Sequence, residues 1–232
     1  MEKFYKIAGL TVKMDTYGRT EEQSKPYECA PCEAVDIELK PDRENYQEHY
    51  PYLCDDDREY VATGSCFYGH LLNFDGLLLH ASAVVVDGKA YLFSAPSGTG
   101  KSTHTKLWLK TFGDRATILN DDKPALRYED GMWYAYGTPW SGKHDLNCNM
   151  RVPLSGIAML ERADTNSIEP FTGAKAVFAL LEQTVRPRGV VFRDKMLNIL
   201  DCLFKQVPVW KLRCNMEDEA VRVSYEAMRG KE

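Results

Sequence analysis

Hydrophobic and polar residues cluster along the middle of the chain in a pattern that predicts a β-hairpin followed by a helix. The apolar run Leu77–Val86 predicts a buried strand, and Lys89–Ser94 predicts a second one. The Asp-Gly pair at 87–88 separates them, and this pair between two apolar runs is typical of a two-residue hairpin turn. A small-residue loop follows, and Lys101–Phe112 then has a helical pattern that ends at a glycine.

The remaining periodic segments alternate between strand and helix. Strands are predicted at Ala116–Leu119, in a hairpin over Ala125–Tyr136, at Ile157–Leu160 and at Val209–Leu212, and helices at Gly173–Val185, Phe192–Val207 and Met216–Met228. Because hairpins interrupt this alternation, the sequence predicts a mixed α/β fold, with a mixed β-sheet flanked by helices.

The first 60 residues have a different character. Phe4–Met14 and Val35–Leu39 each predict a strand, but prolines and an acidic cluster at 55–57 surround them. The composition changes near residue 60. We therefore expect an irregular, strand-containing N-terminal segment or small lobe over 1–60, and a second domain over 61–232.

Composition and charge exclude several classes of protein. The chain has 232 residues, of which 44% are hydrophobic, so it can bury a core. Its net charge of −5 gives no bulk attraction to nucleic acid or to anionic lipid, although a local basic groove remains possible. The apolar run Gly76–Val86 is too short to cross a bilayer, and the N-terminus lacks the pattern of a signal peptide. We expect a cytoplasmic protein that binds neither nucleic acid nor membrane.

The seven cysteines indicate reduced thiols, because their number is odd and the chain is not a small secreted scaffold. Cys29 and Cys32 have the spacing of a zinc or redox pair, but no second ligand pair follows them in the sequence. We favour two thiols in a proline-containing loop, and a metal role for them stays open.

The loop between the hairpin and the helix carries the clearest chemical motif. It reads Ala-Pro-Ser-Gly-Thr-Gly-Lys-Ser from residue 95, and it matches the P-loop pattern except that Ala95 replaces the first glycine. The glycines allow successive backbone N–H groups to face one anion, and the following helix adds its positive N-terminal end. Lys101 would contact the β- and γ-phosphates, and the Ser102 hydroxyl would bind Mg²⁺. The predicted phosphate-binding residues are Ser97, Gly98, Thr99, Gly100, Lys101, Ser102 and Thr103.

Two further elements belong with this loop. Asp121 and Asp122 directly follow a short apolar strand. They therefore lie at its carboxyl end, which is the end where open α/β sheets bind ligands. Adjacent carboxylates on extended chain point to opposite sides, so one can hold Mg²⁺ while the other accepts a proton.

His80 interrupts the first apolar strand. The pairing about the Asp-Gly turn places it opposite Ala95, at the start of the loop.

Basic residues after the second hairpin are candidates for neutralising a phosphoryl group. Lys143 and Arg151 are the cations that we expect to reach it. Trp140 can pack on a base or peptide or belong to the core. Arg186 and Arg188 form a further basic spot, which we interpret as solvated rather than substrate-binding.

The ordered set of His80, hairpin, P-loop and Asp121-Asp122 resembles the catalytic domain of the HPr kinase/phosphorylase family. The P-loop sequence Ser-Gly-Thr-Gly-Lys-Ser at 97–102 is similar to the P-loop sequence of ATP-dependent phosphoenolpyruvate carboxykinases, which share this core. The resemblance covers roughly residues 75–165. It implies a P-loop set in a β-rich framework, and possible homo-oligomers. It also implies that Asp121 is the base toward a serine hydroxyl, that Asp122 binds Mg²⁺ and that His80 lies near the phosphates.

The departures from this family shape the prediction. The Gly-x-Arg-Gly loop of phosphorolysis is not recognisable, so we expect a kinase without phosphorylase activity, and the chain is too short for a carboxykinase. The predicted function is ATP- and Mg²⁺-dependent phosphoryl transfer to an alcohol, foremost a serine of a peptide or small protein. A kinase of free serine and a non-catalytic nucleotide-binding regulatory protein remain alternatives.

Overall fold

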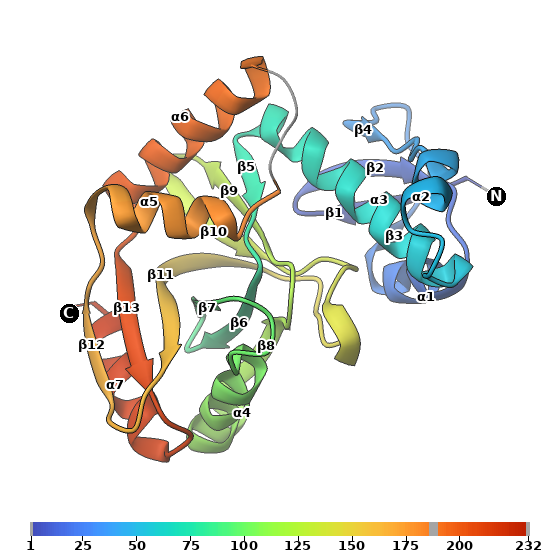
Figure 1. The fold of residues 1–232 in the computed structure, drawn as a ribbon. Coiled ribbons are helices and arrows are strands. Elements are labelled where there is room, and N and C mark those ends of the chain that lie inside the picture. The colour runs from blue at the N-terminus through green and yellow to red at the C-terminus, as the bar shows by residue number, and fades with distance from the viewer. Residues whose placement is uncertain (1, 186–189, 231–232) are drawn as a thin grey trace.

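The N-terminal part of the protein forms a small sheet of its own. The computed structural model describes residues 2–185 and 190–230 (Figure 1). Four strands pair in the order β3-β1-β2-β4, and three helices accompany them. Their bounds are β1 (Lys3–Ile7), β2 (Leu10–Met14), β3 (Glu28–Cys29), β4 (Ile37–Glu38), α1 (Gly18–Ser24), α2 (Arg43–His49) and α3 (Asp55–Leu71).

The strand that we predict at Phe4–Met14 is a hairpin instead. β1 and β2 pair antiparallel, with Ile7 opposite Leu10. Ala8 and Gly9 turn the chain with φ of 51° and 77°. Alanine rarely adopts a positive φ, so the sequence gives little sign of this turn.

The long helix α3 is absent from the predicted elements, because it is acidic at its start and has no clear apolar stripe. Its buried face includes the Glu59 carboxylate, which Arg43 binds through Nε at 2.7 Å and Nη2 at 2.9 Å. The division that we expect near residue 60 falls inside α3 and stays a prediction.

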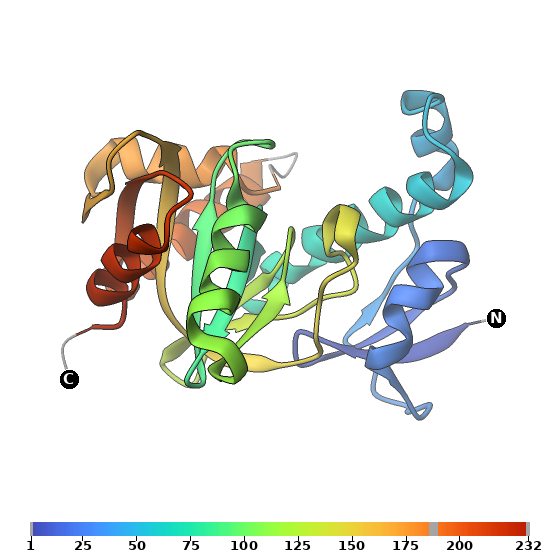
Figure 2. The ribbon, with the colours of Figure 1, turned by 90° about the horizontal axis from the view of Figure 1, so that it is seen from below.

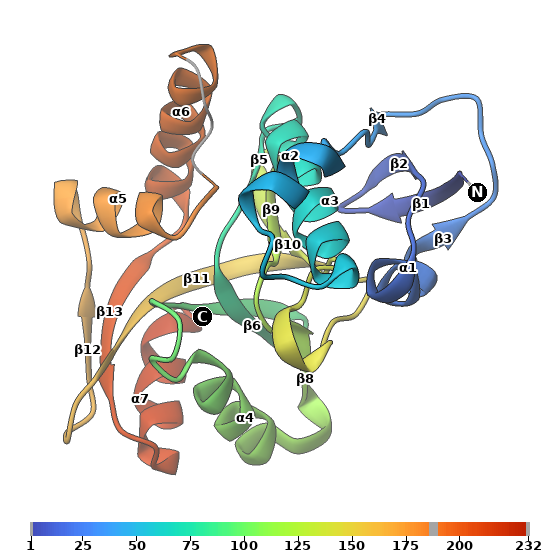
Figure 3. The ribbon, with the colours of Figure 1, turned by 45° about the vertical axis from the view of Figure 1, so that its right-hand side comes forward.

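Over the described residues, the main sheet has nine strands. Their order is β5-β9-β10-β11-β7-β6-β8, and β13 pairs with both β11 and β12. The bounds are β5 (Gly76–Leu78), β6 (Ala81–Val86), β7 (Lys89–Ser94), β8 (Ala116–Asn120), β9 (Ala125–Glu129), β10 (Met132–Tyr136), β11 (Arg151–Arg162), β12 (Ser167–Pro170) and β13 (Val209–Cys214). Figure 3 shows β11 as a long curved strand that connects the two halves of this sheet.

The hairpin around 87–88 has the predicted register, with Val86 opposite Lys89 and Ala81 opposite Ser94. However, the apolar run Leu77–Val86 is two strands rather than one. β5 pairs with β9, whereas β6 pairs with β7 and β8, and the chain changes direction at Leu79 and His80. Both halves are buried, so the run carries no period that would reveal the bend.

Helices cover both faces of the main sheet (Figures 1 and 2). Side chains of α4 (Lys101–Phe112) and α7 (Asp218–Met228) share one buried cluster with the sheet. Side chains of α5 (Gly173–Glu182) and α6 (Val190–Gln206) share another with its opposite face. The fold is therefore mixed α/β, with mixed sheets flanked by helices, as predicted.

Within the described ranges, none of the helices is both long enough and apolar enough to cross a membrane.

Candidate active site

Four parallel strands end at the same edge of the main sheet and bring the predicted site residues together. β7 and β8 both pair antiparallel with β6, and β11 runs parallel to both β7 and β13. The carboxyl ends of β8, β7, β11 and β13 therefore share one edge. Ligands of α/β sheets bind outside this edge.

The P-loop lies at the centre of this edge, directly after β7. Gly98 and Gly100 have φ of 81° and 119°, and no atom lies within 4 Å of a Cβ built on either one. Ala95 is not among the described residues with positive φ, so alanine is tolerated at the first position of the loop. α4 begins at Lys101, as predicted. The loop can thus bring its backbone close to an anion at the N-terminus of a 12-residue helix.

A cleft of about 560 Å³ opens over the loop, between it and the Asp121-Asp122 pair. Ten of the predicted site residues line it: His80, Ser97, Gly98, Gly100, Lys101, Ser102, Thr103, Asp121, Asp122 and Lys143. The sequence did not predict three further lining residues, which are Gly142, His144 and Arg162. Thr99 lies on the other side of the loop.

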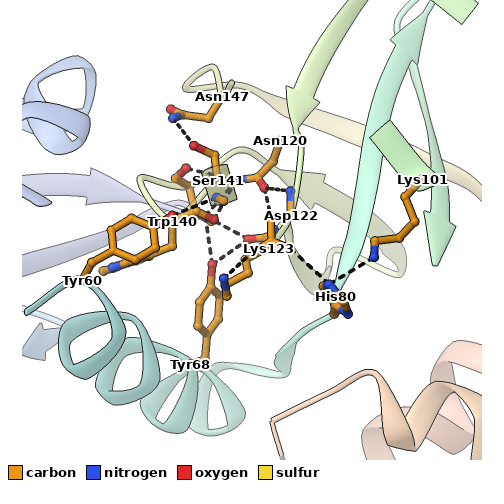
Figure 4. Close-up of polar contacts among 12 residues, drawn as sticks. Tyr60, Tyr68, His80, Lys101, Asn120, Asp122, Lys123, Trp140, Ser141 and Asn147 are labelled. Carbon is orange, nitrogen blue, oxygen red and sulfur yellow. Dashed lines mark hydrogen bonds and ion pairs between the residues drawn. The ribbon is translucent and has the colours of Figure 1, made fainter. Parts of the chain in front are cut away.

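Lys101 and His80 meet at the floor of the cleft. Lys101 Nζ lies 3.1 Å from His80 Nε2 (Figure 4). It also donates a hydrogen bond to the Ala95 carbonyl at 2.9 Å. Burial lowers the pKa of Lys101, and the two aspartates act against this shift. His80 is held from behind by Gln183, whose side-chain oxygen lies 2.9 Å from Nδ1. The bend between β5 and β6 is therefore what points His80 at the P-loop lysine.

Asp121 is largely buried in the wall of the cleft, within a hydroxyl network. Ser82 Oγ donates to Asp121 Oδ1 at 2.7 Å, and it also lies 2.7 Å from Thr105 Oγ1. Ser82 and Thr105 are fully buried, on β6 and α4 respectively. Asp121 is thus fixed through one carboxylate oxygen. The sequence did not predict Ser82 as a site residue, because Ser82 is brought close to Asp121 only by the pairing of β6 with β8.

Asp122 lies beside His80 and Lys123. Its Oδ1 is 3.2 Å from His80 Nε2, and Oδ2 accepts a hydrogen bond from Lys123 Nζ. Burial alone would raise the pKa of Asp122. The hydrogen bonds and charges of His80 and Lys123 outweigh this effect and hold the pKa well below its usual range. The carboxylate is therefore ionised at neutral pH.

The two predicted cations are placed differently. Lys143 lies in a 3₁₀ turn over Gly142–His144 at the rim of the cleft. Arg151 lies at the opposite end of β11, where its Nε contacts Glu129 Oε2 at 3.1 Å, so our expectation for Arg151 does not hold. Arg162, at the carboxyl end of the same strand, lines the cleft and donates to the carbonyls of Gly98 and Thr99.

The other candidate residues do not join the site. Trp140 is fully buried and stacks on Phe67 with ring centroids 5.0 Å apart, so it belongs to the core. No group of three or more His, Cys, Asp or Glu that could hold a metal ion occurs in the described ranges, and Cys29 and Cys32 are free thiols. Arg186 and Arg188 lie outside the described residues.

The N-terminal part of the chain holds the turn that carries Lys143. Arg19 donates to the Gly142 carbonyl and to Asp145 Oδ1, the latter from Nε at 3.0 Å. Gly142 N donates to Tyr60 Oη at 2.9 Å, and Arg19 lies 4.2 Å from the centre of the Tyr60 ring. Arg19 and Tyr60, far from the P-loop in the sequence, thus fix one wall of the cleft.

We expect Arg19→Ala to lower the free energy of unfolding by roughly 1.5–3 kcal/mol, because it removes the charge-assisted hydrogen bonds that hold the turn. The control is Lys25→Ala, which removes an exposed ion pair with Glu22 in the same region. Denaturant unfolding of both variants would check this. Equal loss in both variants, or none in Arg19→Ala, would show that the turn keeps its position without Arg19.

The fold and the cleft together define a mixed α/β protein with a P-loop at the carboxyl edge of its parallel strands. The chain belongs to the family described as SynChlorMet cassette protein ScmC, which residues 60–219 match. Among solved structures, the Hpr(Ser) kinase/phosphatase from Coxiella burnetii is similar, with 13% sequence identity and a TM-score of 0.36. That similarity covers 66% of this chain and 99% of the other. Of the curated proteins, none matches the chain.

Proposed function

We propose that this protein is an ATP- and Mg²⁺-dependent kinase that transfers the γ-phosphoryl group to a serine hydroxyl of a peptide or small protein. The observation that carries the proposal is that Lys101, Ser102 and the Asp121-Asp122 pair line one cleft. Phosphoryl transfer needs little more from a protein than positioning and electrostatic stabilisation, and these groups are the kind that supply both.

The P-loop would hold the triphosphate. Backbone N–H groups around Gly98 and Gly100 and the N-terminus of α4 would face the phosphate oxygens. In the structure, the Lys101 ammonium donates to the Ala95 carbonyl. A rotation of the lysine side chain would bring the ammonium to the β- and γ-phosphates of a bound nucleotide. Arg162 and Lys143 would add positive charge at the rim.

The residues present fit a magnesium ion. Mg²⁺ prefers oxygen ligands and is commonly held by one or two carboxylates together with substrate phosphates. The ionised Asp122 carboxylate and the Ser102 hydroxyl supply such ligands in one cleft. When bound, the ion would neutralise charge on the phosphates.

Asp121 would act as the base. The acceptor hydroxyl passes its proton to Asp121 while its oxygen forms a bond to the γ-phosphorus. The bond between the γ-phosphorus and the bridging oxygen breaks, and ADP leaves with that electron pair. Ser82 already occupies Oδ1, so it would keep the carboxylate oriented with Oδ2 toward the acceptor.

The serine acceptor is supported by the order of His80, P-loop and aspartate pair, which resembles that of the HPr kinases. This order does not distinguish a peptide serine from free serine. The acceptor therefore has to be identified by transfer itself.

The test is transfer of label from γ-labelled ATP with Mg²⁺ to serine-containing peptides and, separately, to free serine. Lys101→Ala should abolish transfer. Lys106→Ala removes an exposed lysine from the same helix and should leave transfer unchanged. Label on a peptide would support the proposal. Label on free serine alone would instead show that the protein is a metabolic kinase of free serine. ATP binding without any transfer would overturn the kinase and favour a nucleotide-binding regulatory protein.

A further inference from the structure

A second cleft, of about 320 Å³, opens on the other side of the P-loop from the aspartate pair. It lies between α4 and the carboxyl ends of β11 and β13, which are the strands next to β7 on that side. Its apolar walls come from Leu107, Leu160, Cys214 and Met216. Small-molecule pockets are typically of this size and mainly apolar.

The two clefts adjoin at the loop. Gly100, Thr103 and Arg162 line both of them. A molecule with its phosphates over Lys101 can therefore extend past Thr103 into the second cleft. The change from polar to apolar walls along this path matches a ligand that is charged at one end and aromatic at the other.

We propose that the second cleft binds the base and sugar of the nucleotide whose phosphates lie over the P-loop. This inference rests on the proposed function, because it assigns the rest of the same ligand. The flat base would lie against Leu107 and Met216, and the sugar would lie near Thr103.

The polar groups of this cleft are only partly engaged within the protein. The Asn215 side chain donates to the Asp164 carbonyl at 3.2 Å and accepts from Glu217 N at 3.0 Å. His104, which also lines the cleft, accepts from Trp108 Nε1 through Nε2 at 3.1 Å, whereas its Nδ1 is buried without a hydrogen-bond partner among the described residues. The cleft therefore has a polar group beside its apolar walls.

Calorimetric titration would test the assignment with three probes: ATP, GTP and inorganic tripolyphosphate, each with Mg²⁺. Met216→Ser is the first variant, because Met216 is 75% exposed and the fold does not depend on it. Leu107→Ala combined with Met216→Ser is the second. Lys106→Ala, on the same helix but outside the cleft, is the matched control.

The expected result is that the double variant binds ATP and GTP about tenfold more weakly, since apolar contact with the base is lost. Its affinity for tripolyphosphate, which has no base, should equal that of the parent. Unchanged ATP affinity in both variants would overturn the base pocket and leave the phosphate site intact. A parent protein that binds neither ATP nor tripolyphosphate would instead overturn the proposed function.

Discussion

Asp121→Asn is expected to lower the rate of phosphoryl transfer by about 10²–10⁴-fold, which is the usual contribution of general acid–base catalysis. Asparagine has nearly the same shape, and its oxygen can still accept the Ser82 hydrogen bond that Asp121 Oδ1 accepts at 2.7 Å. It cannot accept a proton from the acceptor hydroxyl. The affinity for ATP should therefore remain close to that of the parent while kcat falls.

Two further variants make this experiment specific. Asp114→Asn changes an exposed aspartate at the other end of β8 and should leave the rate unchanged. Asp122→Asn should raise the Mg²⁺ concentration needed for half-maximal rate, because it removes the proposed metal ligand. Parental transfer by Asp121→Asn, with ATP bound, would exclude Asp121 as the base.

Gly142→Ala is expected to lower the transfer rate about 100-fold, since a displacement of 1 Å at a reacting group can cost that much. An added Cβ would lie 2.7 Å from Asp122 Cβ and 3.0 Å from its Cγ. The turn cannot easily retreat, because Arg19 and Tyr60 both hold Gly142. The substitution would therefore push the Asp122 carboxylate out of place.

The same substitution also adds backbone strain, since Gly142 has a φ of +78°. Gly88→Ala isolates this second effect. Gly88 has a φ of +74°, but a Cβ there would meet nothing within 4 Å. Both variants should lose stability in thermal unfolding, Gly142→Ala the more because of its added contact with Asp122, while only Gly142→Ala loses activity. Matching activity losses in the two variants would mean that contact with Asp122 does not matter.

The features that the sequence predicted well are those set by local chain geometry. The 87–88 turn forms because Asp87 and Gly88 adopt φ of 50° and 74° at low cost, and this fixes the β6–β7 register. α4 has the predicted ends, because Gly100 and Gly113 both take positive φ at its boundaries.

The features that the sequence missed depend on contacts far along the chain. Nothing within Leu77–Val86 shows that its first part pairs with β9 and its second with β7. α3 buries Glu59, which is stable there because Arg43 binds it. A charge that is buried with its partner does not look like a core position in the sequence.

The two arginines of β11 separate what the sequence determined from what the tertiary structure decided. The sequence alone determined the P-loop motif and its place between a strand and a helix, because residues 97–103 are consecutive and their backbone conformation is local. It also placed Asp121 and Asp122 at the end of a strand. Arg151 and Arg162, however, lie at opposite ends of one strand, about 35 Å apart along extended chain. Only the parallel pairing of β11 with β7 decides that Arg162, and not Arg151, lies at the cleft, because parallel strands end at the same edge of a sheet.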